Sequence, residues 1–136
     1  MATAVDQALK GRLVLSPYQS EGIEAHLRYL SDDPFAVHLA FPATAALEGE
    51  EVEWIFAREL LDDGLYEPTG DGDIHLWPCA PGRVMIEFES PHGMALVEFA
   101  AADLRDFLHW SYQAVPAGHE SRHVDFDGEL ETLLDR

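Results

Sequence analysis

Cysteine is nearly absent from this sequence, which has a single one, Cys79, among 136 residues. One thiol excludes an internal disulfide framework and any zinc site built from a group of cysteines. Cys79 follows Pro78, and no recognisable nucleophile and base pair accompanies it, so we interpret it as a buried or neutral thiol.

Positive charge is also scarce. Lysine and arginine number 8 against 26 aspartates and glutamates, which gives a formal net charge of -18 at pH 7. Nucleic-acid backbones and anionic membrane surfaces carry the same sign and should be repelled. The basic side chains are scattered singly along the chain, at Lys10, Arg12, Arg28, Arg58, Arg83, Arg105, Arg122 and Arg136. We therefore expect no nucleic-acid partner.

Long hydrophobic runs are missing as well. The longest uncharged apolar-rich stretch, residues 34–47, has 14 residues and contains two prolines. A membrane-spanning helix needs about 18 apolar residues. Residues 1–12 have neither the basic segment nor the apolar core of a signal peptide. We expect a cytoplasmic protein that does not insert directly into a membrane.

What remains is the composition of a globular protein, with 47% hydrophobic and 25% charged residues. Domains most often have about 100 to 150 residues, so the length favours one domain over residues 1–136. Alternation of apolar and polar residues predicts about seven strands, and the short spacing between them favours antiparallel pairing. The predicted strands are residues 9–16, 22–30, 35–41, 51–56, 74–78, 83–89 and 94–99.

Three segments have helical patterns. Residues 57–63 are helix formers, and Gly64 is expected to cap their C-terminal end. Residues 101–114 have an apolar stripe and stop before Pro116, as the residue before a proline should. A third, short helix is predicted at residues 127–135. Strands followed by a terminal helix pair indicate an α+β fold.

Motifs for catalysis or cofactor binding are not recognisable. The chain has no phosphate-binding loop, dinucleotide fingerprint or nucleophile elbow. The nearest approach to a metal cluster is His119, His123, Asp125 and Asp127, but Pro116 and Gly118 precede it, so a helix that brings both histidines together is not expected. We predict no cofactor, no metal site and no enzymatic activity.

Two kinds of side chain could instead bind a protein partner. Acidic residues form one run at Glu48, Glu50, Glu51 and Glu53 and a second between residues 59 and 73. These runs are either solvated faces that keep the protein soluble or a docking surface that steers a basic partner.

Trp110 lies off the inward stripe of the helix at 101–114, where it could anchor a partner or a neighbouring subunit, or be buried from a second side. Trp54 and Trp77 stand in strand patterns and are predicted to be core residues. The predicted partner-binding residues are Trp110, Tyr112, His109, Glu48, Glu50 and Glu51.

Several blocks of sequence together resemble the SsgA-like proteins, the small sporulation and cell division regulators of sporulating actinomycetes. The most specific block is Trp-Ile-Phe-Ala-Arg-Glu-Leu-Leu at residues 54–61, joined to glycine turns at residues 68–74 and 90–93. Further matches are residues 33–37, 77–78, 107–108, 115–120, 122–123 and 125–127. The resemblance runs from about residue 13 to residue 134, and the SsgB type is the most similar.

This resemblance implies a non-enzymatic factor that helps to place the division septum and recruits the tubulin-like protein FtsZ, together with SsgA-type relatives. It also implies a location at division septa, a Whirly-like fold with two antiparallel sheets backed by helices, and assembly as a homo-trimer. Family members commonly carry a basic residue and an aspartate after Phe-Leu, where this chain has His109, Trp110 and Gln113, so a partner surface on this helix should differ from theirs.

The alternative function is binding of single-stranded nucleic acid, since Whirly-like folds bind it elsewhere. Such binding combines a positively charged groove with stacking aromatic side chains. The eight scattered basic residues favour the protein-interaction hypothesis over this one.

Overall fold

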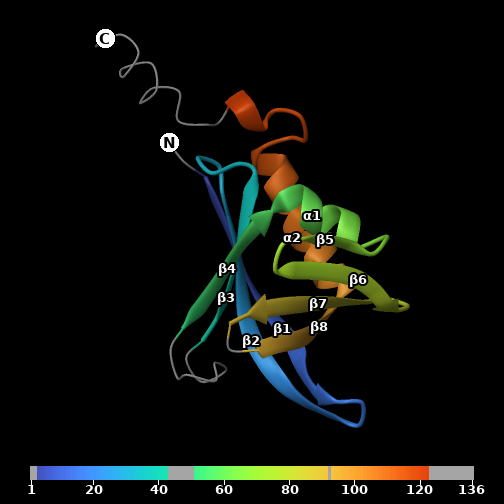
Figure 1. The fold of residues 1–136 in the computed structure, drawn as a ribbon. Helices are drawn as coiled ribbons and strands as arrows, with labels where there is room; N and C mark the ends of the chain where they lie inside the picture. The colour runs from blue at the N-terminus through green and yellow to red at the C-terminus, as the bar shows by residue number, and fades with distance from the viewer. Residues whose placement is uncertain (1–2, 43–50, 92, 123–136) are drawn as a thin grey trace.

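The computed structural model describes residues 3–42, 51–91 and 93–122, and over these residues it has eight strands, two α-helices and one short 3-10 helix (Figure 1). The chain forms β1 (Ala4–Ser16), β2 (Gln19–Leu30), β3 (Ala36–Phe41), β4 (Val52–Ala57), α1 (Arg58–Gly64), β5 (Thr69–Asp71), β6 (Ile74–Ala80), β7 (Arg83–Ser90), β8 (Gly93–Ala100), α2 (Ala101–Ala114) and η2 (Glu120–Arg122).

All eight strands belong to one antiparallel sheet, in the order β4-β3-β2-β1-β8-β7-β6-β5. The expectation of two sheets is therefore wrong. Residues 11–14 of β1 pair with residues 96–99 of β8 and join the two halves. Gly11 permits this junction, because a Cβ at that position would lie 2.7 Å from the ring of Phe99.

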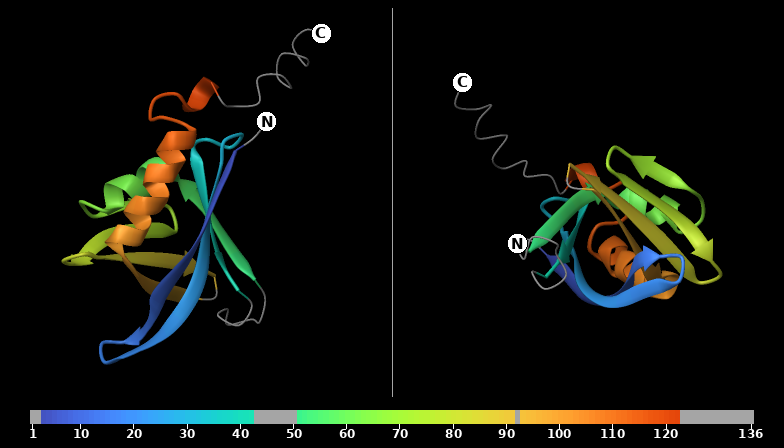
Figure 2. Two further views of the ribbon diagram at one scale, coloured as in Figure 1. Left: turned by 180° about the vertical axis from the view of Figure 1, so that it is seen from behind. Right: turned by 60° about the horizontal axis from the view of Figure 1, so that its bottom comes forward.

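The sheet curls around α2, as both views in Figure 2 show. Its concave face and the inward stripe of α2 form the core, with Leu104 and Phe107 of the helix fully buried. The period-two pattern of β2 is confirmed, since Ala25, Leu27 and Tyr29 are buried while the residues between them are exposed. Local alternation therefore decides which face of each strand packs against the helix.

The seven predicted strands are all present, although β1, β2 and β6 are longer than predicted and one strand was missed. β1 begins at Ala4 instead of residue 9, because its first residues continue the ladder with β2 up to the pair Ala4 and Leu30. An eighth strand, β5, lies in the segment predicted as a turn. Gly70 of this strand pairs with His75 of β6, and Gly72 forms the connecting turn with a φ of 59°. This three-residue strand was not predicted because its residues have the composition of a turn.

The helix at 101–114 is confirmed with its predicted end, since Val115 is the C-cap of α2. The prediction that Gly64 caps α1 is wrong, because Gly64 is the last residue of the helix and Leu65 is the C-cap with right-handed φ and ψ. Gly64 instead allows α1 to lie close to β6, because a Cβ at this position would lie 2.6 Å from Cβ of Leu76. The helix predicted at 127–135 lies outside the described residues.

The two strand tryptophans differ in their packing. Trp54 is partly buried against the core and its ring lies 5.0 Å from that of Phe88, centroid to centroid. Trp77 was predicted to be a core residue, and this is wrong. Leu76 before it is fully buried, so the alternation of β6 turns Trp77 to the convex face, where it is half-buried.

Candidate functional site

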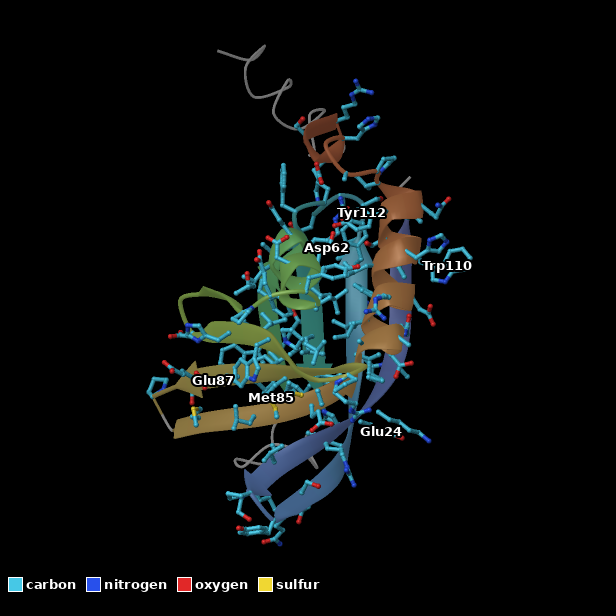
Figure 3. The ribbon with its side chains drawn as sticks, turned by 90° about the vertical axis from the view of Figure 1, so that its right-hand side faces the viewer. Glu24, Asp62, Met85, Glu87, Trp110 and Tyr112 are labelled. Carbon is cyan, nitrogen blue, oxygen red and sulfur yellow. The ribbon has the colours of Figure 1, made fainter. Side chains whose placement is uncertain are left out.

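The outward face of α2 presents the aromatic side chain that the sequence singled out. Trp110 is 58% exposed, and the sticks in Figure 3 show it pointing away from the sheet. The neighbouring His109 is also exposed, and its ring meets that of Trp110 edge to face at 5.3 Å. A large exposed aromatic side chain on a rigid helix has the properties of an anchor for another protein.

Tyr112 is on the opposite side of the same helix. Its hydroxyl donates a hydrogen bond of 2.8 Å to Oδ2 of Asp62 on α1, and Figure 3 shows the two residues turned toward each other. Burial, together with this hydrogen bond, strongly raises the pKa of the Tyr112 phenol. The structure therefore separates Tyr112, which packs α2 against α1, from Trp110 and His109, which face solvent.

Behind Tyr112 lies a buried arginine, Arg58, at the first position of α1. Its side chain is 2% exposed. The guanidinium Nη1 donates to the carbonyl oxygens of Ser111, at 3.1 Å, and Val115, at 2.9 Å. Nη2 donates to Oε1 of Glu120 at 2.9 Å. The last carbonyls of a helix have no partner within the helix, so Arg58 satisfies part of the C-terminal end of α2.

Two aromatic rings enclose the guanidinium. Its central carbon lies 4.7 Å from the ring centroid of Tyr29 and 4.2 Å from that of Tyr112. The Tyr29 hydroxyl in turn donates to the carbonyl of Pro34 at 2.9 Å. A cation over aromatic faces gains electrostatic attraction that increases when water is excluded. Arg58 thus connects β2, α1 and the end of α2.

Glu120 completes this network from η2, after α2 has ended. Burial opposes its ionisation, but hydrogen bonds from its own backbone N–H and from Arg58 outweigh burial and lower the pKa of the carboxyl. The path of the chain after α2 is therefore fixed by a charged contact. Sequence reasoning missed Arg58 because it counted this residue only as one of eight basic residues scattered along the chain. The available signal was its place in the Trp-Ile-Phe-Ala-Arg block, directly after a strand.

The acidic run is described in part. Glu51 is exposed, whereas Glu48 and Glu50 lie outside the described residues. Glu51 belongs to a shallow hollow of about 260 Å³ on the convex face of the β1–β4 half, lined by Asp6, His26, Arg28, His38, Ala40, Glu51 and Glu53. In this hollow Nη2 of Arg28 lies 3.1 Å from Oδ2 of Asp6, so the lining carries both signs of charge.

The sequence offered two further candidates for chemistry, a single thiol and a cluster of histidines and aspartates. Burial and the nearby Glu98 raise the pKa of the Cys79 thiol, which keeps it in its poorly nucleophilic form. His119 is exposed, and its proposed partners His123, Asp125 and Asp127 lie outside the described residues. No helix in the described part of the chain is long and apolar enough to cross a membrane.

Fold and surface together define a class of protein: a curled antiparallel sheet around one helix, with a buried arginine network and an exposed aromatic side chain. Residues 23–120 match the family model described as Streptomyces sporulation and cell division protein, SsgA. The sporulation-specific cell division protein SsgB of Streptomyces coelicolor is 46% identical, and the match covers 98% of each chain. SsgB of Thermobifida fusca is 45% identical over 78% of this chain and 77% of the relative.

Solved structures agree with these relatives. An SsgA-like sporulation-specific cell division protein from Thermobifida fusca aligns with a TM-score of 0.84 at 38% identity, over 96% of each chain. A structure reported with mutations in SsgB that correlate to longitudinal cell division during sporulation of Streptomyces coelicolor aligns with a TM-score of 0.82 at 45% identity, over 90% of this chain and 97% of that one. The chain belongs to the SsgA family of sporulation and cell division proteins.

Proposed function

We propose that this protein is a non-enzymatic regulator of sporulation-specific cell division, which helps to position the septum and recruits FtsZ through protein contacts. The observation that carries the proposal is the 46% identity to SsgB of Streptomyces coelicolor across 98% of both chains.

The surface supports action by contact. Trp110 and His109 offer an exposed aromatic pair on α2, and Tyr112 holds that helix against α1 from the other side. Glu51, followed by the half-exposed Glu53, adds negative charge beside β4, and Glu48 and Glu50 precede it in sequence. We propose Trp110, His109, Glu48, Glu50 and Glu51 as the residues that contact the partner, with Tyr112 holding α2 in place for that contact.

The direct test is a titration of purified FtsZ against the immobilised full-length protein, with and without an SsgA-type relative. Trp110→Ala should weaken binding by about 30-fold, because central aromatic anchors contribute about 2 kcal/mol or more. The matched control is Tyr66→Ala, which removes another exposed aromatic side chain, 68% exposed, on the loop after α1. Absence of FtsZ binding in both formats would contradict the proposal, and equal losses in the two variants would contradict the assignment to Trp110.

Assembly and location complete the proposal. We expect a homo-trimer of the 15.2 kDa chain by light scattering, and a fluorescent fusion that gathers at division septa. If Trp110 contacts a neighbouring subunit, Trp110→Ala will lower the mass as well as FtsZ affinity. If it contacts FtsZ alone, the mass will stay that of the wild type.

Binding of single-stranded nucleic acid, through a Whirly-like fold, is the competing hypothesis. Three arginines are bound within the described structure: Arg28 to Asp6, Arg58 to Glu120 and Arg83 to Glu98. Fewer cations therefore remain for phosphates. Micromolar binding of a labelled oligonucleotide at low salt, measured by fluorescence anisotropy, would reverse the order of the two hypotheses.

A further inference from the structure

A cluster of ligand-type side chains lies on the convex face of β6 and β7, far from α2 in the fold. His75 of β6 stands directly opposite Glu87 of β7, and Glu89 follows two residues later on the same face. The backbone N–H of Glu89 donates to the carbonyl of Asp73 at 2.8 Å, so the ladder continues to this point. Figure 3 shows Glu87 on this face of β7. We propose that His75, Glu87 and Glu89 bind a divalent first-row cation of the Zn²⁺ type.

The distances fit a shared ion. One ligand atom from each of the three side chains lies within 4.8 Å of the other two. Nδ1 of His75 is 3.5 Å from Oε1 of Glu87. Two donors bound to zinc at about 2.1 Å with a tetrahedral angle are about 3.4 Å apart. His75 and Glu87 are therefore already at a ligating separation, and Glu89 needs a rotamer adjustment at an exposed site.

The histidine nitrogen that faces this cluster lacks a hydrogen bond. Nδ1 of His75 is inaccessible to solvent and has no hydrogen-bond partner among the described residues. Most buried polar atoms in folded proteins are paired. Among the described residues this nitrogen has only the 3.5 Å ion-pair contact with Oε1 of Glu87, while the His75 side chain as a whole is 44% exposed and can be reached by an ion from solvent. The ring is also held in place, because it packs over Gly70, where a Cβ would lie 2.2 Å from Cδ2 of His75. An ion beside Nδ1 would meet a lone pair that is already oriented.

The local charge matches a divalent cation. Within the described residues, no lysine or arginine forms an ion pair with Glu87 or Glu89, and His75 is the basic side chain that contacts Glu87. Two carboxylates and a neutral imidazole carry two negative charges. A protonated His75 would offset one of them, whereas a divalent ion would offset both.

The donor set selects the kind of ion. Mg²⁺ and Ca²⁺ prefer oxygen donors alone, whereas an imidazole with carboxylates suits zinc and its first-row neighbours. Three protein ligands leave one tetrahedral position, and the exposure of Glu89 lets water fill it. Such an ion would connect β6 to β7, and through the contact of His75 with Gly70 it would also stabilise the hairpin of β5.

Calorimetric titration of the untagged full-length protein with ZnCl₂ tests the proposal. The wild type should bind one equivalent, and His75→Gln and Glu87→Gln should each weaken binding at least tenfold. His26→Gln is the matched control, because this exposed histidine also faces a carboxylate, with Nδ1 3.7 Å from Oδ1 of Asp6. His123→Gln controls for the cluster at residues 119–127. Both controls should bind as the wild type does.

Two further measurements test zinc binding at His75 even if one of the variants folds poorly. Zinc should raise the unfolding temperature of the wild type and leave that of His75→Gln unchanged. In nuclear magnetic resonance spectra of the wild type, zinc should shift the ring nitrogens of His75 before those of other histidines. No binding, loss of binding in His123→Gln, or first shifts at another histidine would each overturn the assignment.

Discussion

At the scale of single residues, Arg58 stands out because it contacts parts of the chain that lie far apart in the sequence. It joins the carbonyl end of α2, the carboxylate of Glu120 and the rings of Tyr29 and Tyr112. A buried charge that has lost its partners destabilises the folded state. Partner groups that stay buried after the charge is removed also destabilise it. Substitutions in this network should therefore affect the free energy of unfolding more than most.

Arg58→Met should destabilise the protein by about 3 kcal/mol, the lower end of what breaking a buried ion pair costs, because Glu120 keeps some contact with water. The substitution keeps most of the volume but removes the guanidinium donor from the Glu120 carboxylate and from the Val115 carbonyl, while the Ser111 carbonyl keeps its hydrogen bond from the Val115 N–H. Urea denaturation measures the change. Arg105→Met, at an exposed position of α2, is the control and should change the free energy by less than about 0.5 kcal/mol. Equal effects would contradict the role of Arg58.

His38 gives the fold a dependence on pH. Its Nδ1 lies 3.0 Å from Oε1 of Glu53, and its Nε2 lies 3.1 Å from Oδ2 of Asp33. Burial alone lowers the pKa of the imidazole, but the two carboxylates outweigh it and raise the pKa above the ordinary value of 6.5. A raised pKa means that the folded state holds its proton more tightly than the unfolded state does.

The stabilisation by His38 is therefore fully present below the unfolded pKa and is lost as pH rises through the folded pKa. The free energy of unfolding of the wild type, relative to His38→Gln, should fall as the pH rises from about 6.5, the ordinary pKa of histidine, through the raised pKa of the folded state. The carboxylates are about half exposed, so the change should stay below about 1 kcal/mol. Urea denaturation across this range measures it. His109→Gln should leave the pH dependence intact, and loss of the dependence there would refute the assignment to His38.

At the scale of elements, α1 depends on a missing side chain. Gly64 brings the helix against β6, since a Cβ there would lie 2.6 Å from Cβ of Leu76. Alanine would favour the helix by about 1 kcal/mol, but overpacking costs about 1 to 3 kcal/mol. Gly64→Ala should thus destabilise the protein in thermal denaturation. Gly22→Ala, in β2 with no atom within 4 Å of the added Cβ, should have little effect. A stabilised Gly64→Ala would show that the contact is loose.

The elements differ in how much of them the sequence could predict. The bounds of α2 follow from a local pattern, because an apolar stripe and Pro116 suffice to set them. The exposure of Trp110 follows from the same stripe. The strand β5 and the packing role of Gly64 depend on Gly70 meeting His75 and on α1 meeting β6, and neither contact has a periodic signal.

The site shows the same division. The pairing of Arg58 with Glu120 spans 62 positions, and His75 meets Glu87 through strand register. Register emerges only when strands pair, so a search for ligand spacing along the chain passed over His75. That search considered His119 and His123 instead, and it predicted no metal site. The expectation of two sheets came from the family resemblance. The pairing of β1 with β8, which joins segments at opposite ends of the chain, makes a single sheet instead.

At the scale of the whole molecule, net charge should govern association. Raising salt from about 0.05 to 0.5 M shortens the screening length from over 10 Å to roughly 4 Å. If the acidic surface steers a basic site on FtsZ, binding should weaken over this range, mostly through a slower association rate. Surface plasmon resonance at several salt concentrations measures both rates. An affinity independent of salt would instead favour an apolar anchor such as Trp110.

Among the residues that the structure describes, the sheet curls around α2 without closing, and the strand order leaves β4 and β5 each paired on one side only. β5 has three residues and offers few backbone groups to an added strand. β4 has six residues, with Glu53 as its one charged side chain. A strand edge of that length is a template on which another extended segment can align and add hydrogen bonds. Where nothing covers this border, we expect the ladder to continue from one molecule into the next at high concentration.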